Sequence, residues 1–117
     1  MQLFNTRGHQ LRQFTPLHPD SVRMYSCGPT VYNHAHIGNL SSYIYADILR
    51  RTLRQCFGTT KHVMNITDVD DKTIRDSLAK YPARPPRQAL QRLTDHYQQI
   101  FLDEMKAVGN NIDDITL

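Results

Sequence analysis

The residues with the clearest chemical potential lie in one short stretch, from Met24 to Asn39. A single thiol, Cys27, stands at the predicted end of a strand, and a glycine–proline turn follows it. Nine positions later comes His36, followed by Gly38, where the next helix is expected to start. Strand ends that lead into helix N-termini are where open α/β sheets bind ligands, because free backbone N–H groups point outward there. The stretch therefore predicts a site that handles sulfur or a metal together with a phosphate.

The tetrapeptide His36-Ile37-Gly38-Asn39 has a physical logic for nucleotide binding. Gly38 lacks a side chain, so an adenine or a ribose can approach the backbone closely. His36, held at a helix N-terminus, can donate hydrogen bonds to phosphate oxygens. Taken alone, the tetrapeptide is also explained as an ordinary capped helix start, so it does not decide the function.

Metal binding is a second possibility that single residues leave open. A four-coordinate zinc site needs three or four protein ligands, and Cys27 is the one convincing candidate. A lone thiol at a strand end more often serves packing. The acidic residues Asp68, Asp70 and Asp71 could hold a hard cation, but acidic side chains are also favoured at the start of a helix.

Length and composition restrict the class of protein. The 117 residues allow one domain at most, with a single core. The formal charge of +3 permits an anionic partner but does not argue for one. Two cysteines do not make a disulfide framework, which favours a reducing compartment. Since no apolar run approaches the ~20 residues of a membrane helix, we expect a cytoplasmic protein without a membrane partner.

The surrounding pattern predicts an α/β fold built on one βαβ unit. Residues 1–20 are expected to form an N-terminal extended or hairpin segment, residues 21–80 the βαβ core, and residues 86–108 a long helix. The expected elements are short strands at Gln2–Asn5 and Leu11–Phe14, core strands at Val22–Ser26 and Lys61–Thr67, a helix from about Asn39 to Gly58, and a helix from Asp70 to about Ala79.

The helix after Asn39 is expected to bury one apolar face, with Cys56 as a small buried side chain beside it. In the second core strand, Val63 and Ile66 are the expected β-branched anchors. The expected apolar faces are Leu40, Ile44, Ile48, Leu49, Leu53 and Phe57 on the first helix, and Leu90, Leu93, Tyr97, Ile100, Phe101, Met105 and Val108 on the long one.

The βαβ order brings two distant segments together. Two strands joined by a crossover helix run parallel, so their carboxyl ends lie at the same edge of the sheet. Cys27 and the segment Asn65–Asp68 should therefore face one crevice, although they lie far apart in the sequence.

Together, three sequence blocks resemble the N-terminal part of the catalytic domain of cysteinyl-tRNA synthetases. The blocks are Cys27–Tyr32, His36–Asn39 and Asn65–Lys72, and they stand in the family's order and nearly at its spacings. The resemblance covers essentially all 117 residues, including Leu3–Thr6 and Phe101–Met105. It implies the first half of a Rossmann-type (class I aminoacyl-tRNA synthetase, HUP-like) parallel sheet with flanking helices.

The resemblance also implies a chemistry. In this family, ATP and L-cysteine form cysteinyl-adenylate, and the cysteinyl group then passes to tRNA(Cys). Cys27 matches the first ligand of a Zn²⁺ ion that binds the substrate thiolate and thereby rejects serine. The implied site residues are His36, Ile37, Gly38 and Asn39 for ATP, with His36 and Asn39 catalytic, and Gly28, Thr30, Asn65, Thr67 and Asp68 for cysteine.

Two positions depart from the family pattern, and some parts of the family are missing. Asn39 stands where many members have a second histidine, and Ser41 stands where an arginine is expected. The remaining zinc ligands, a lysine-rich loop and the anticodon-binding helices would lie beyond Leu117. We therefore expect a fragment that stops near the family's insertion point, is inactive alone and tends to self-associate.

Three alternatives remain open. The cysteine ligase of mycothiol synthesis shares the adenylation chemistry, although Lys72 after paired aspartates looks more like the tRNA enzyme. A truncated synthetase paralogue could serve as a binding module. A generic zinc- or nucleic-acid-binding domain is disfavoured by the single metal-type cysteine and the mild basic excess.

Overall fold

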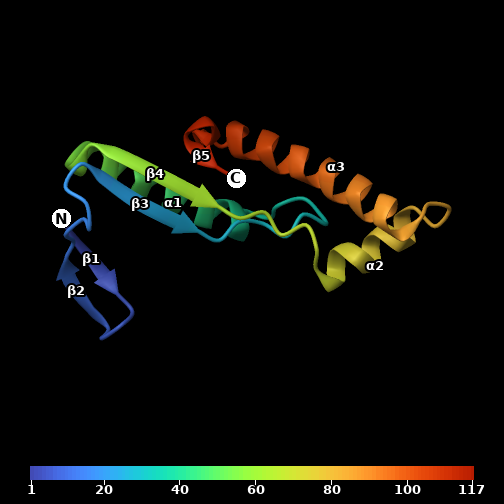
Figure 1. The fold of residues 1–117 in the computed structure, drawn as a ribbon, viewed down its shortest axis with the longest axis horizontal. Coiled ribbons are helices and arrows are strands. Elements are labelled where there is room, and N and C mark those ends of the chain that lie inside the picture. The colour runs from blue at the N-terminus through green and yellow to red at the C-terminus, as the bar shows by residue number, and fades with distance from the viewer.

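A small parallel sheet and two long helices form the body of the computed structural model, which describes residues 1–117 (Figure 1). The molecule is elongated, with extents of 55 × 30 × 26 Å. The elements are β1 (Gln2–Asn5), β2 (Gln10–Gln13), β3 (Ser21–Ser26), α1 (Ile37–Phe57), β4 (Thr59–Met64), α2 (Asp71–Lys80), α3 (Pro86–Ala107), the 3-10 helix η1 (Ile112–Asp114) and β5 (Ile115–Thr116).

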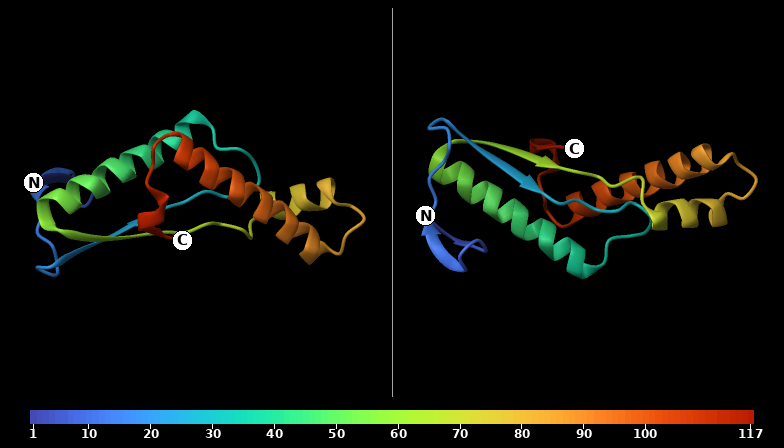
Figure 2. Two further views of the ribbon diagram at one scale, coloured as in Figure 1. Left: turned by 90° about the horizontal axis from the view of Figure 1, so that it is seen from above. Right: turned by 60° about the horizontal axis from the view of Figure 1, so that its bottom comes forward.

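The expected βαβ unit is confirmed. β3 and β4 pair in parallel, and α1 crosses between them along one face of the sheet (Figure 2). A third strand that the sequence pattern did not predict, β5, pairs in parallel with β4 through His62 and Val63. The sheet order is therefore β3-β4-β5, with the carboxyl ends of all three strands pointing the same way.

The helix α1 begins at Ile37, earlier than expected, because His36 serves as its N-cap. It ends where Gly58 adopts a φ of 82°, a left-handed conformation that favours glycine. The Gly58 N–H bonds to the carbonyl of Arg54.

The face that α1 buries differs from the predicted apolar stripe. Ile48 is 54% exposed and Cys56 is also exposed, so both predictions of burial were wrong. Two charged residues take part in the buried face instead. The buried residues of α1 are Tyr43, Asp47, Arg50 and Leu53.

Asp47 and Arg50 are buried because they are paired. Arg50 forms an ion pair with Asp47 and another with Asp114 at 2.9 Å, and it donates to the carbonyl of Asn111 at 3.1 Å. A buried charge is tolerated when opposite charges and hydrogen bonds compensate it. The network therefore ties α1 to the segment that leads into β5.

The predicted anchors of the second core strand were partly wrong. Val63 is 43% exposed, whereas its neighbours His62 and Met64 are each 1% exposed. Successive side chains of a strand point to opposite faces, so choosing Val63 as an anchor selected the wrong face. Ile66, the second anchor, is half-buried but lies beyond the end of β4.

The helices α2 and α3 pack against each other as a hairpin (Figure 2). Asp70 caps α2 in a capping box with Thr73, and Pro86 occupies the first turn of α3, so both predicted starts are confirmed. The C-terminal half of α3 reaches the sheet, but Val108 is 38% exposed and lies outside its buried face. The main core cluster is Tyr43, Met64, Phe101 and Met105.

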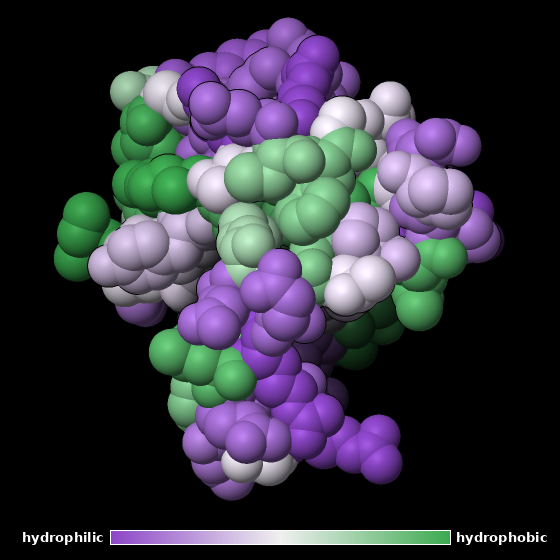
Figure 3. Space-filling model, turned by 90° about the vertical axis from the view of Figure 1, so that its left-hand side faces the viewer, coloured by the Kyte–Doolittle hydropathy of each residue, from purple (hydrophilic) through white to green (hydrophobic).

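The N-terminal hairpin lies at the end of the molecule opposite the α2–α3 hairpin (Figure 1). β1 and β2 pair antiparallel, as expected. Leu17 is 97% exposed, and Phe4 and Leu11 are exposed as well. Figure 3, which views this end, shows hydrophobic groups on the surface among hydrophilic ones.

Candidate active site

The two segments that follow β3 and β4 lie side by side. The Val31 N–H donates to the carbonyl of Thr67 at 3.1 Å, and the Thr67 N–H donates to the carbonyl of Pro29 at 2.9 Å. Thr30 and Thr67 thereby form an isolated parallel bridge. The predicted convergence of the two strand ends is confirmed at these residues.

The Asn65 side chain holds the two strand ends together. Its Oδ1 atom accepts from the Tyr25 hydroxyl at 2.8 Å and from the Gly28 N–H at 3.1 Å. Its Nδ2 atom donates to the Thr67 hydroxyl at 3.1 Å. Since these bonds are internal to the protein, the Asn65 amide shapes the crevice by supporting its wall.

Gly28 is needed for the close approach of these two segments. A Cβ atom at Gly28 would lie 1.8 Å from the backbone oxygen of Asn65, well inside van der Waals contact. Its backbone dihedrals require no glycine, because Gly28 is not among the glycines with positive φ. The glycine therefore serves packing of backbone against backbone.

The His36 turn folds back on itself. The Gly38 N–H donates to His36 Nδ1 at 3.1 Å, so the imidazole caps its own helix. A Cβ atom at Gly38 would lie 3.0 Å from Cε1 of that ring. Gly38 therefore makes room for His36 itself, a role separate from the predicted approach of a nucleotide. Ser41, one of the two departures from the family pattern, donates to the Gly38 carbonyl at 2.9 Å.

A cavity of about 470 Å³ opens between these segments, within the size range of small-molecule sites. Four of the predicted site residues line it, namely Gly28, Thr30, His36 and Asn39. Its other lining residues are Pro29, Val31, Tyr32, Asn33, His34, Ala35, Tyr43, Lys72 and Phe101.

The other predicted site residues lie outside this lining. Asn65 and Thr67 support the wall through the hydrogen bonds described above. Cys27, Ile37 and Asp68 are exposed, and the hydrogen-bond partner of Cys27 Sγ is the Gly28 carbonyl, at 3.7 Å. Gly38, also exposed, acts through the imidazole of His36.

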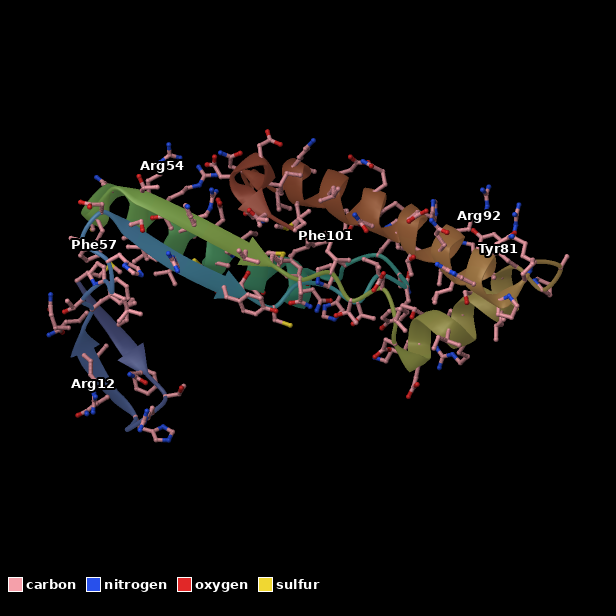
Figure 4. The ribbon with its side chains drawn as sticks, viewed as in Figure 1. Arg12, Arg54, Phe57, Tyr81, Arg92 and Phe101 are labelled. Carbon is pink, nitrogen blue, oxygen red and sulfur yellow. The ribbon has the colours of Figure 1, made fainter.

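The sequence pattern missed the residues that the helices contribute to the cavity. Tyr43 and Phe101 meet edge to face with ring centroids 5.2 Å apart, and Figure 4 shows Phe101 on the side of α3 nearest the end of β4. Burial, and secondarily the charge of nearby Cys27, raises the pKa of the Tyr43 hydroxyl. Phe101 was predicted only as part of the apolar face of the long helix, and Tyr43 was not part of either predicted apolar face.

Lys72 is the third helical contribution, and its Nζ atom lies 5.2 Å from the centroid of the Tyr32 ring. It stands in the first turn of α2, where the helix dipole disfavours a cation. That unfavourable placement is a signal by which the sequence could have marked Lys72 as a site residue.

The residues of this chain do not form a zinc site by themselves. No group of three or more His, Cys, Asp or Glu side chains lies together in the structure. His34, in the loop between β3 and α1, pairs with Glu104 at 2.8 Å. A tetrahedral zinc site would need further ligands next to the exposed thiol of Cys27.

The helices of the structure are too short or too polar to cross a membrane.

Comparison with known proteins decides the family. The family model of the class I (C) tRNA synthetase catalytic domain matches residues 13–116. This chain belongs to that family. The match includes the parallel strands, the His36 turn and all three cavity-lining helices, so the cavity lies within the catalytic domain of a class I synthetase.

Three similar relatives carry one name. The chain is 44% identical over 106 residues to a cysteine–tRNA ligase of Solibacter usitatus, covering 91% of this chain and 22% of the relative. It is 46% identical over 112 residues to the ligase of that name from Rhodopseudomonas palustris (strain BisA53), covering 93% and 24%. The ligase of Koribacter versatilis is 45% identical over 109 residues, covering 93% and 21%. The chain thus spans between a fifth and a quarter of these relatives.

Proposed function

We propose that this chain supplies part of the ATP and cysteine site of a cysteine–tRNA ligase. The complete reaction would join cysteine to ATP as cysteinyl-adenylate and pass the cysteinyl group to tRNA(Cys). The observation that carries the proposal is the cavity at the carboxyl ends of two parallel strands, lined by the His36 turn. Phosphate groups are favoured at such a place, because it combines a helix N-terminus with a strand end.

The proposed roles follow the two walls of the cavity. His36 and Asn39 would contact ATP and act in catalysis, while Ile37 and Gly38 shape the turn beneath the nucleotide. The cysteine would lie against the other wall. The residues of this second wall are Gly28, Thr30, Asn65, Thr67 and Asp68.

The work of these residues would be positioning. Adenylate formation requires the cysteine carboxylate beside the α-phosphate of ATP, and good orientation can contribute ~7–11 kcal/mol to lowering a barrier. The hydrogen bonds of Asn65 and the cap of His36 would hold the two walls in place before substrates bind. The chain carries only part of the relatives' length, so we infer that it does not activate cysteine or charge tRNA alone.

Cys27 is proposed as one zinc ligand, with the other ligands supplied from outside residues 1–117. The exposure of its thiol is compatible with that role. The isolated chain should then retain no zinc after dialysis against a chelator, as measured by atomic emission. Stoichiometric zinc in that sample would contradict the proposal. We also propose a cytoplasmic location, where such a thiol stays reduced.

The function can be tested in a hybrid ligase, in which residues 1–117 replace the matching segment of the Solibacter usitatus relative. We expect cysteine-dependent exchange of pyrophosphate into ATP by the hybrid ligase, and none by the 117-residue chain alone. Cysteine should be required, and serine should not replace it. A correctly folded hybrid without exchange would refute the proposal, and exchange by the chain alone would refute its dependence on the remaining length.

Within the chain, residues 21–80 would be the nucleotide-binding core, and residues 86–108 the helix that leads to the family's insertion point. Residues 1–20 would be an accessory segment. Deleting residues 1–12, which the family model does not match, should leave exchange by the hybrid ligase within about twofold.

A further inference from the structure

A carboxylate outside the predicted site holds the loop that precedes His36. Glu104 lies on α3, and its Oε1 atom is 2.8 Å from Nδ1 of His34. Its Oε2 atom accepts from the backbone N–H of Ala35 at 3.2 Å. Since His34, Ala35 and His36 are consecutive, one side chain from a distant helix restrains the two residues just before the catalytic turn.

Aromatic contacts restrain the same loop from both helices of the α2–α3 hairpin. The His34 ring meets Tyr97 of α3 edge to face, with centroids 5.9 Å apart. Lys72 of α2 lies over the Tyr32 ring. These contacts involve only side chains of the loop. Glu104 also accepts from the backbone N–H of Ala35, so it fixes the position of the loop backbone.

The Glu104 contact is poorly placed to contribute much to stability. The side chain of His34 is 63% exposed, and exposed ion pairs stabilise proteins little. A displacement of about 1 Å in a group that orients substrates can nevertheless lower a rate ~10²-fold. The position of the loop is therefore the property on which this contact acts most strongly.

The geometry points to Glu104 as a positioning residue that keeps His36 at the wall of the cavity by fixing residues 34–36. Glu104 does not line the cavity, so it acts through the loop and does not touch the substrates. This inference rests on the proposed function, because it assigns His36 to adenylate formation.

The test compares Glu104→Ala with Asp103→Ala in the hybrid ligase. Asp103 is a matched control, because it is the adjacent exposed acid of α3 and its side chain bonds only Gln99 on the same helix. We expect Glu104→Ala to lower kcat of pyrophosphate exchange about 10–100-fold. KM for cysteine and the Tm should stay close to those of Asp103→Ala, which should itself resemble the parent.

A second variant keeps the test informative if Glu104→Ala does not fold. Glu104→Gln keeps an oxygen that can accept from Ala35 but loses the charge opposite His34, so its kcat should fall between those of the parent and Glu104→Ala. In the 117-residue chain, the amide resonance of Ala35 should shift in Glu104→Ala and stay in place in Asp103→Ala.

Three results would overturn the inference. One is equal kcat in Glu104→Ala and Asp103→Ala. If Glu104→Ala does not fold, equal kcat in Glu104→Gln and Asp103→Ala would have the same meaning. Another is a joint fall of kcat and Tm in both Glu104 variants, which would indicate a purely structural role. Absence of exchange in the parent hybrid ligase would refute the proposed function itself, and this inference with it.

Discussion

The two ends of the parallel sheet are held by different kinds of contact. At the carboxyl end, separate segments are joined by hydrogen bonds: the side chains of Asn65 and Glu104 accept from backbone N–H groups, and Thr67 bonds through its backbone. At the amino end, Phe14, which follows the hairpin, meets Phe57 at the end of α1, with ring centroids 5.4 Å apart. Hydrogen bonds are directional and apolar contacts are not, so the carboxyl end is the one suited to hold reacting groups in place.

The exposed side chains at the two ends of the sheet differ as well. The amino end leaves Leu17 97% exposed, together with Phe4 and Leu11. These apolar groups favour self-association of the isolated chain, which stays a prediction. The carboxyl end exposes Ile37 as well, by 79%, but there the polar side chains of His36 and Asn39 line a cavity.

The largest difference between the two ends should be in catalysis. His36→Ala in the hybrid ligase should lower pyrophosphate exchange about 10²–10³-fold, because a group that stabilises the transition state contributes ~2–4 kcal/mol. His18→Ala, which changes an exposed histidine at the amino end, should leave the rate unchanged. Exchange by His36→Ala at the parent rate would contradict the role given to this turn.

A second difference should appear in stability, and it compares two glycines. Gly28→Ala at the carboxyl end forces a Cβ atom to 1.8 Å from a backbone oxygen, so we expect a loss of about 3 kcal/mol, the upper end of the usual cost of overpacking.

Gly58→Ala at the amino end is the matched variant. No atom lies within 4 Å of its added Cβ, and only its backbone conformation, with a φ of +82°, opposes it, at a cost of about 2 kcal/mol. Urea unfolding of the 117-residue chain measures both losses. Equal losses would contradict the close packing expected at Gly28, because the strand ends would then have moved apart to accept the new side chain.

The smallest expected effect is a pH dependence from the middle of the sheet. His62 is 1% exposed, and its Nε2 atom is 2.8 Å from the Ser26 hydroxyl. Burial, then the charge of Arg50, lowers its pKa below the ordinary 6.5, while Asp47 opposes the shift. At a pH below that value, the unfolded chain binds a proton that the folded chain does not. Stability should therefore be full above about pH 6.5 and fall as the pH is lowered.

The variant His62→Gln should flatten this dependence, whereas His18→Ala should keep it. The measurement is the free energy of unfolding of the chain in urea between about pH 7.5 and about pH 5.5. This range spans the ordinary histidine pKa of about 6.5. An unchanged pH slope in His62→Gln would exclude His62 as its source.

Much of the fold could be predicted because local signals mark it. Asp70, Pro86 and Gly58 identify helix ends by capping and backbone preference, and they stand where expected. The parallel pairing of β3 and β4 follows from the βαβ order. The meeting of their carboxyl ends, and hence the location of the cavity, follows from the same rule.

What could not be predicted depends on partners that are distant in sequence. Asp47 is a local partner of Arg50, but the buried charge also needs Asp114 and the carbonyl of Asn111, which lie far away in the sequence. β5 has only two residues and exists through pairing with β4. The contributions of Tyr43 and Phe101 to the cavity likewise arise from the way α1 and α3 pack.

The self-capped turn at the start of α1 also determines the tautomer of its histidine. Because Nδ1 of His36 accepts from the Gly38 N–H, the neutral ring must carry its proton on Nε2. The ring can then only donate through its outer nitrogen, and an anionic oxygen is the partner that this atom prefers. The helix backbone thus selects the form of the imidazole before a ligand arrives. A side chain at Gly38, only 3.0 Å from the ring, would release that choice.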